Sequence, residues 1–290
     1  MKRIGPLILL LWTSAVLAEP ADSVFVEQVL KKYAGASKCI YASGKDAGTL
    51  VVSIAKEFLG RPYVGGTLEV NAPDEALVVN TREVDCTTFV DQVLALTLAV
   101  LHGETGYAAF CRWLTELRYR GGTLDGYASR LHYFTDFAHD NAEWFDFLPA
   151  TDDVRCLLQE VSLSFMSTHP DSYPALKGNP VMVSLIREVE IRFAGYSVPY
   201  IPKAETSLYA MLREGDVVAL LTTVKGLDVS HLGIVVREQG ELRLLHASSV
   251  AGKVIVEPRS LPVMLSTRKS CPGIRALRLK NKTYHKIEKE

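Results

Sequence analysis

The segment Val84-Asp85-Cys86-Thr87-Thr88-Phe89-Val90 decides the fold, because it places a cysteine at the start of a helix. From Phe89 onward, apolar residues recur at intervals of three and four, and Thr87 or Thr88 can cap the first turn. The positive end of a helix and its unpaired N–H groups stabilise a thiolate. The pattern therefore predicts an amphipathic helix from Cys86 to Leu101 whose first turn holds a cysteine with a lowered pKa.

Two of the seven histidines lie in strand-like runs, Ser230–Val236 and Glu241–Ala247, separated by Gln239-Gly240. If Gln239-Gly240 is a two-residue hairpin loop, the register places His231 and His246 diagonally on one face, roughly 7–8 Å apart or less. This is the geometry of a general base and the residue that orients it. A slip of one residue would separate the two histidines. Taken singly, each residue also fits a structural role, since cysteines are commonly buried as small apolar side chains.

Several blocks that occur in a fixed order resemble the NlpC/P60 cysteine hydrolases and, more narrowly, the DUF1460 family, described as N-acetylmuramoyl-L-alanine amidase-like. The similarity runs from about Ala47 to about Lys280. It implies cleavage of the amide between N-acetylmuramic acid and L-alanine, with 1,6-anhydro-muropeptides as preferred substrates. The blocks are Leu59–Thr67, Arg82–Val90, Arg118–Gly122, Gly126–Phe134, Gly215–Val218, Gly226–Ile234 and Leu245–Ser249.

The resemblance assigns catalytic roles to Cys86 as nucleophile, His231 as base and His246 as the orienting residue. It assigns Tyr63 and Asp85 to substrate binding, with the Tyr63 hydroxyl available to a developing oxyanion. Packing beneath its loop is the alternative role of Tyr63. Many relatives in the superfamily have Asp-Cys-Ser-Gly where this chain has Asp-Cys-Thr-Thr. The γ-D-glutamyl-diaminopimelate specificity common in that superfamily is therefore not carried over.

A short segment in the middle of the chain combines a cation, an imidazole and a phenol, Arg130, His132 and Tyr133. An arginine can pair with carboxylates of a stem peptide, and an aromatic ring can pack on a sugar face. We therefore predict that these three residues bind substrate. The alternative is an internal ion pair of Arg130 with Asp136 or Asp140, with Tyr133 in the core.

The periodicity predicts an α+β fold of the papain-like NlpC/P60 type, with N-terminal helices followed by an antiparallel sheet of about five strands. One domain spans residues 19–280, and a family-specific insertion at about 118–203 is expected to wall the substrate cleft. The expected helices are Ser23–Tyr33, Leu50–Leu59, Cys86–Leu101 and Gly106–Leu117. The expected strands, arranged as a meander, are Val217–Thr223, His231–Arg237, Leu242–His246, Lys253–Glu257 and Ile274–Leu279.

The N-terminus has the pattern of a signal peptide over residues 1–18. Met1-Lys2-Arg3 is basic, Ile4 to Leu17 is mostly apolar, and cleavage is expected after Ala18. We expect an exported, periplasmic protein without a membrane anchor, because the apolar run is shorter than the roughly 20 residues of a transmembrane helix. The tail at 281–290 is rich in Lys and Glu and is expected to be flexible.

Length and composition permit a globular enzyme, and the resemblance implies peptidoglycan fragments (muropeptides) as its substrates. The net charge of −1 argues against nonspecific nucleic-acid binding, and a hydrophobic fraction of 48% permits a globular core. No zinc-like spacing is present, so we predict no metal and no cofactor, and we predict no protein partner. Five cysteines leave one unpaired, which Cys86 would account for. The others could form two disulfides or none: Cys39, Cys111, Cys156 and Cys271.

Two other functions remain open. The first is a peptidase that cuts between D-glutamate and diaminopimelate with the same catalytic residues. The second is a non-catalytic muropeptide-binding protein in which Cys86 is merely buried. The products of a digest distinguish the two enzymes from each other, and thiol reactivity distinguishes an enzyme from a binding protein.

Overall fold

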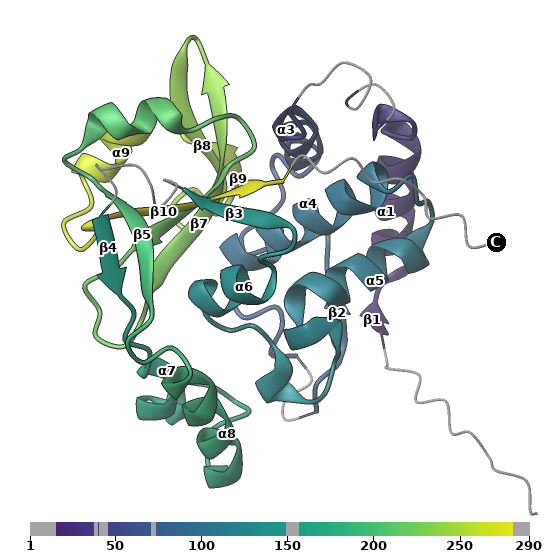
Figure 1. The fold of residues 1–290 in the computed structure, drawn as a ribbon. Helices are drawn as coiled ribbons and strands as arrows, with labels where there is room; N and C mark the ends of the chain where they lie inside the picture. The colour runs from purple at the N-terminus through teal and green to yellow at the C-terminus, as the bar shows by residue number, and fades with distance from the viewer. Residues whose placement is uncertain (1–15, 38–39, 41–45, 71–73, 149–156, 281–290) are drawn as a thin grey trace, which may run out of the picture.

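A computed structural model describes residues 16–37, 40, 46–70, 74–148 and 157–280 (Figure 1). The basic and apolar start of the expected signal peptide, residues 1–15, lies outside the described residues, as do Cys39, Cys156 and the tail at 281–290. The structure therefore does not test whether Cys39 and Cys156 take part in a disulfide.

The four helices predicted for the N-terminal half are confirmed, with bounds that differ by a few residues. The helices are α1 (Pro20–Lys32), α3 (Gly48–Lys56), α4 (Cys86–Leu101), α5 (Tyr107–Arg118), α6 (Phe134–Asp140), α7 (Phe165–Thr168), α8 (Pro180–Ile191) and α9 (Leu261–Ser266). The short 3₁₀ turns are η1 (Arg120–Gly122), η2 (Tyr127–Ser129), η3 (Pro170–Ser172) and η4 (Thr206–Met211). Within the described ranges, no helix combines the length and apolarity needed to cross a membrane.

Helix α4 is buried on nearly every side, whereas the spacing of its apolar residues predicted a half-exposed amphipathic helix. It packs against the helices α1, α3 and α5 and the strands β7 and β8, so most of its polar residues are enclosed as well (Figure 1). Its N-cap is Asp85 rather than Thr87 or Thr88, because the Asp85 carboxylate accepts hydrogen bonds from both threonine N–H groups. The Thr88 hydroxyl completes a capping box with the Asp85 N–H.

The main sheet has eight antiparallel strands rather than about five. Strand order is β4-β5-β10-β6-β7-β8-β9, and β3 also pairs with β10. The strands are β3 (Phe145–Leu148), β4 (Leu157–Glu160), β5 (Ser197–Pro202), β6 (Val217–Leu221), β7 (Val229–Glu238), β8 (Glu241–Ser248), β9 (Lys253–Val256) and β10 (Gly273–Leu279). The expected meander is wrong at its end, because α9 carries the chain back so that β10 pairs with β6. The three additional strands come from the 118–203 segment, which is thus partly built into the sheet.

The hairpin that carries both histidines has the predicted register. Gln239 and Gly240 both adopt positive φ angles, 53° and 82°. This is the backbone of a type I′ turn, whose twist matches that of the flanking strands. Glu238 pairs with Glu241 across the two-residue loop, and the same register continues to the pair Ile234 and Leu245.

Apolar clusters cover both faces of the sheet. In β6, Val217 and Ala219 join the cluster formed with the helices α1, α3, α4 and α5, while Val218 and Leu220 join a second cluster that includes residues of α9. A third cluster lies within the 118–203 segment and connects α7 and α8 with β5. Figure 1 shows the first helical group on one side of the sheet and the α7–α8 pair at one end of the molecule.

The residues just before the expected cleavage point form a strand. β1 (Val16–Ala18) pairs in parallel with β2 (Leu77–Val79), and its side chains are exposed while those of β2 are buried. Helix α1 begins directly after it, with Glu19 as N-cap.

Candidate active site

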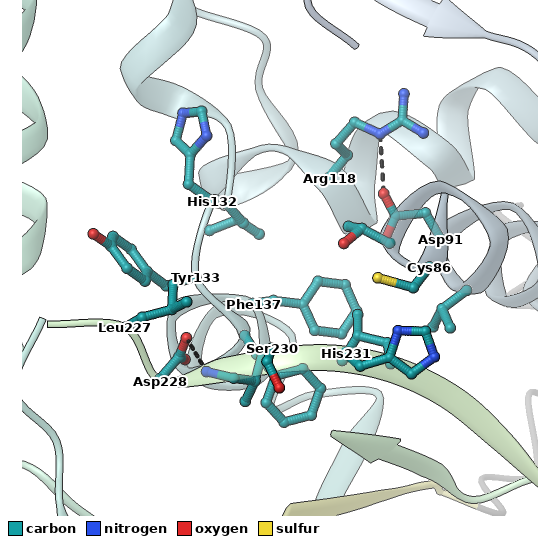
Figure 2. A pocket seen from close by; sticks show the side chains of 16 residues that line it. Cys86, Asp91, Arg118, His132, Tyr133, Phe137, Leu227, Asp228, Ser230 and His231 are labelled. Carbon is teal, nitrogen blue, oxygen red and sulfur yellow. Dashed lines mark hydrogen bonds and ion pairs between the residues drawn. The ribbon is translucent and has the colours of Figure 1, made fainter. Parts of the chain in front are cut away.

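A pocket lies where the start of α4 meets the start of β7 (Figure 2). Its cavity volume is about 150 Å³, which is smaller than the roughly 300–1,000 Å³ of typical small-molecule sites. The 118–203 segment supplies several of its walls through α6 and the residues before it. The lining residues are Cys86, Thr87, Val90, Asp91, Arg118, Leu131, His132, Tyr133, Phe134, Phe137, Leu227, Asp228, Val229, Ser230, His231 and Leu232.

Cys86 is the first residue of α4 and lines this pocket, as the sequence predicted for its position. Its predicted pKa is wrong. Burial and the Asp85 carboxylate raise the pKa of the Cys86 thiol to about 11, although hydrogen bonds from the Leu232 backbone and the Thr87 side chain act in the opposite direction. The helix terminus favours the thiolate, but the carboxylate that caps this helix opposes it.

His231 and His246 meet as the hairpin register predicted. The Nε2 atom of His231 lies 2.6 Å from Nδ1 of His246, and both rings are buried. This leaves Nδ1 as the ring nitrogen of His231 that takes no part in the contact with His246. His231 and Cys86 both line the pocket and are labelled in Figure 2. Burial lowers the pKa of His231 to about 3 and that of His246 to about 4, so both rings are neutral at pH 7.

Behind His246 lies Glu257, a residue that the sequence analysis did not single out. Its Oε2 is 3.7 Å from Nε2 of His246, and its Oε1 accepts a hydrogen bond of 2.6 Å from Nε of Arg259. Burial tends to raise the pKa of Glu257, but hydrogen bonds from Arg259 outweigh it, and the pKa lies below its ordinary value. The pairing of β8 with β9 could have predicted this contact. His246 pairs with Ile255, and Glu257 follows two residues later on the same side of the sheet.

Tyr63 lies close to the nucleophile without lining the pocket. Its backbone bridges to Val84, two residues before Cys86. Burial, followed by the charges of Cys86 and Asp85, raises the pKa of its hydroxyl. Asp85, which we expected to bind substrate, uses its carboxylate to cap α4.

Arg130 is engaged inside the protein. Nε and Nη2 donate to the carboxylate of Glu75, and Nη1 donates to Glu69 at 2.6 Å. The guanidinium therefore has no donor aimed at the pocket, and Arg130 is absent from the pocket lining. An internal ion pair was the alternative prediction, but its expected partner Asp136 pairs with Arg120 instead.

His132 and Tyr133 do line the pocket, but their polar atoms are used elsewhere. Nε2 of His132 hydrogen-bonds the Tyr127 carbonyl, and burial lowers its pKa to about 3. The Tyr133 hydroxyl donates to Glu190 at 2.6 Å and accepts from the Met166 N–H. Nε2 of His132 and the Tyr133 hydroxyl are therefore not available to a substrate.

Two buried carboxylates of the pocket were missed by the sequence analysis. Asp91 pairs with Nε of Arg118 at 3.1 Å. Asp228 accepts a hydrogen bond from the Thr135 N–H in α6 and so fixes the loop before His231. Among the described residues, no group of three acidic, histidine or cysteine side chains is arranged to hold a metal. Cys111 and Cys271 are free thiols outside the pocket.

A family profile and a similar solved structure point to the same family. The sequence profile of a family described as N-acetylmuramoyl-L-alanine amidase-like (AmiA-like) matches residues 53–274. A solved structure of an N-acetylmuramoyl-L-alanine amidase from Bacteroides uniformis is 36% identical, with a TM-score of 0.76, covering 81% of this chain and 99% of that one.

Other solved structures share the fold under different descriptions. A Bacteroides fragilis protein provisionally described as a xylanase is 43% identical, with a TM-score of 0.73, covering 78% of this chain and all of that one. A Legionella pneumophila protein of the DUF1460 family is 21% identical, with a TM-score of 0.63, covering 89% and 96%. At that identity it shows the fold alone.

A curated chaperone, an HscA homologue from Pasteurella multocida, is 31% identical over 104 residues. The match spans 36% of this chain and 17% of the chaperone. A similarity limited to so small a part of that protein gives no support to a chaperone function.

Proposed function

Because the chain belongs to the N-acetylmuramoyl-L-alanine amidase-like family, we propose that it is a cysteine amidase that hydrolyses the bond between N-acetylmuramic acid and L-alanine in peptidoglycan fragments. One observation carries the cysteine mechanism: Cys86 lines a pocket together with His231, whose far nitrogen contacts His246 at 2.6 Å. A helix-borne cysteine packed against an antiparallel sheet that carries the histidines also supports the papain-like NlpC/P60 architecture.

The resting protonation states define the mechanism. A thiol with a pKa of about 11 next to a histidine with a pKa of about 3 forms a neutral pair. His231 therefore acts as a general base while substrate is attacked: Nδ1 takes the thiol proton as Sγ of Cys86 bonds to the amide carbonyl carbon. The carbonyl oxygen becomes an oxyanion held by the Cys86 N–H, and we propose the Tyr63 hydroxyl as a second donor that would have to turn toward the pocket.

The remaining steps return the enzyme to its starting state. His231 gives the proton to the nitrogen of L-alanine as the carbon–nitrogen bond breaks, which leaves a thioester on Cys86. Water then attacks the thioester and loses a proton to Nδ1 of His231. The thiolate leaves and takes that proton, and the muramoyl acid is released.

The pocket chemistry favours an amidase over a glycosidase. Glycosidases require two carboxylates that flank the scissile bond, one as acid and one as base or nucleophile. Here Asp91 is paired with Arg118, and Asp228 accepts hydrogen bonds from the backbone of Thr135 and Val229. The neighbouring structure described as a xylanase therefore does not change the proposal.

We place the substrate among 1,6-anhydro-muropeptides. The sequence resemblance suggests this class, and the pocket walls contain Leu131, Phe134 and Phe137, whose apolar surfaces suit the face of a compact bicyclic sugar.

The proposed setting is the periplasm, after removal of a signal peptide at Ala18. Cleavage there would turn the Glu19 N–H into an ammonium group. In the structure this nitrogen already donates to the buried carboxylate of Asp22 at 3.0 Å, so the new charge would have a partner in place. Mass spectrometry of protein recovered from the periplasm tests the cleavage site. If the measured mass corresponds to a protein whose first residue is not Glu19, the proposed cleavage site is wrong.

The decisive experiment is mass spectrometry of products from a disaccharide tetrapeptide with an anhydro-muramic end. Wild type is expected to release free disaccharide and intact tetrapeptide. Cys86→Ala is expected to release neither, while the control Cys111→Ala, which alters a thiol outside the pocket, retains activity. An L-alanyl-D-glutamyl fragment left on the sugar would identify an endopeptidase instead, and binding without cleavage by wild type would identify a binding protein.

A further inference from the structure

The His231–His246 contact can hold its proton in two ways, and only one of them permits catalysis. This inference rests on the proposed cysteine mechanism. If Nε2–H of His231 donates to Nδ1 of His246, then Nδ1 of His231 is unprotonated and can accept the thiol proton. If Nδ1–H of His246 donates instead, the neutral His231 ring must carry its proton on Nδ1, facing Cys86. The 2.6 Å separation is compatible with either arrangement.

The outcome depends on the far nitrogen of His246. Nε2 of His246 is buried and has no hydrogen-bond partner within the described part of the chain. The group facing it is the Glu257 carboxylate, with Oε2 at 3.7 Å and only 5% of the residue exposed. A protonated Nε2 would present its hydrogen to this carboxylate, whereas an unprotonated Nε2 would present a lone pair to a negative charge.

We propose that Glu257 is a positioning residue that fixes the His231–His246 pair in the catalytically competent tautomer. It keeps the His246 proton on Nε2, so that Nδ1 of His246 must accept and Nδ1 of His231 stays open toward Cys86. The contact at 3.7 Å is a charge–dipole interaction across a buried gap, and it needs no proton transfer to the carboxylate.

The other charges around the pair do not compete for this role. Arg259 holds Oε1 of Glu257 and so aims Oε2 at His246. Arg268, in the turn after α9, disfavours a proton on either ring, Arg259 disfavours one on His246, and burial disfavours both. On the α4 side, Asp85 lies next to Cys86 and acts on its thiol. Glu257 is thus the charged group that favours a proton on His246.

Because Arg259 holds one side of residue 257, the substitution Glu257→Gln should orient its amide in a known way. Arg259 requires an acceptor, so the glutamine side chain should turn its carbonyl oxygen to Arg259 and its NH₂ group to His246. An NH₂ donor facing Nε2 favours the opposite tautomer, with the His246 proton on Nδ1. Removing Arg259 in the double variant Glu257→Gln/Arg259→Ala frees the amide to rotate, so its oxygen can again accept from Nε2–H.

The experiment combines histidine ¹⁵N spectroscopy of the full protein with kinetics on the anhydro-disaccharide tetrapeptide. Long-range ¹H–¹⁵N spectra report which ring nitrogen carries the proton. Wild type is expected to show a protonated Nε2 on both rings, and Glu257→Gln a protonated Nδ1. The kcat of Glu257→Gln should fall by about 10²- to 10⁴-fold, the scale seen when a residue that orients a catalytic histidine is changed, with little change in KM. Part of the loss should return in the double variant.

Glu241→Gln serves as the matched control, because Glu241 is an exposed glutamate at the start of the same strand that carries His246. It should leave both spectra and kcat unchanged. An unchanged tautomer in Glu257→Gln would overturn the proposal, and so would equal losses of kcat in the single and double variants. If Glu257→Gln does not fold, wild-type spectra with Nδ1 of His231 protonated would still overturn it. The spectra need no turnover, so a wild type that releases no disaccharide would refute the proposed function without deciding the tautomer.

Discussion

The protonation state of Cys86 provides the most direct test of the site. The structure places its pKa at about 11, compared with 9.0 for an unperturbed thiol. At pH 7 the thiolate fraction is then about 1 in 10⁴, roughly 100-fold lower than for the unperturbed thiol, because each pKa unit changes the fraction tenfold. Since the thiolate is the reactive form, iodoacetamide should label Cys86 at least about 100-fold more slowly than a cysteine in an unfolded peptide.

The assay follows labelling of the tryptic peptide that contains Cys86, which separates this thiol from the other cysteines. The rate should rise about tenfold per pH unit between pH 7 and pH 9, with no plateau. A rate that is independent of pH between 5 and 8 would refute the reasoning, because it would indicate a thiolate–imidazolium pair already formed in the free enzyme.

Substitution of Asp85 separates its two effects. Asp85→Asn removes the negative charge beside Cys86, so the thiol pKa should fall and labelling at pH 8 should accelerate. Asparagine caps helices about as well as aspartate, so stability should change little, whereas Asp85→Ala should cost about 1 kcal/mol through loss of the cap. Equal labelling rates in wild type and Asp85→Asn would exclude the carboxylate as a cause of the raised pKa.

Three further predictions concern stability. Three buried histidines have pKa values of about 3 to 4, below their unfolded value near 6.5, so the unfolded state binds more protons as the pH falls. They are His132, His231 and His246. Stability should be full above pH 6.5 and lower by about 1 kcal/mol per histidine at pH 5.5, and equal urea midpoints at pH 7.5 and 5.5 would contradict this. Gly48→Ala should destabilise by about 1–3 kcal/mol in urea unfolding, because a Cβ there would meet the Glu214 carbonyl oxygen at 1.9 Å; an unchanged midpoint would show that the contact relaxes freely. Asp91→Ala should cost about 3–5 kcal/mol in the same assay because Arg118 would remain buried without its counter-charge, and a loss below 1 kcal/mol would argue against that pairing.

The meeting of His231 and His246 could be predicted because its information is local, whereas their link to Cys86 came from the family resemblance. The turn at Gln239-Gly240 fixes the register of the hairpin, and alternation along the strands then places His231 and His246 on one face. The apolar run after Cys86 likewise predicted α4, although the N-cap is Asp85 and not Thr87 or Thr88.

Long-range features escaped the sequence for physical reasons. The pairing of β10 with β6 joins segments separated by α9, and short strands such as β4 have no clear alternation of buried and exposed residues. The internal ion pairs of Arg130 could not be read from the sequence, because its partners Glu75 and Glu69 lie 55 and 61 residues away. The raised pKa of Cys86 likewise depends on burial by the surrounding fold, and the spacing of apolar residues in a helix does not predict that burial.

A neutral resting pair also predicts the pH dependence of catalysis. The acid limb of kcat/KM reports the base of the free enzyme, and His231 has a pKa of about 3. Activity should therefore not decline through pH 6.5, as it would for an unperturbed histidine, and kcat/KM should stay level from pH 8 down to about 5.5. If kcat/KM instead fell tenfold per pH unit below pH 6.5 while circular dichroism showed the protein still folded, the pKa of His231 would be near 6.5 and not lowered by burial. The neutral pair would then not be the resting state.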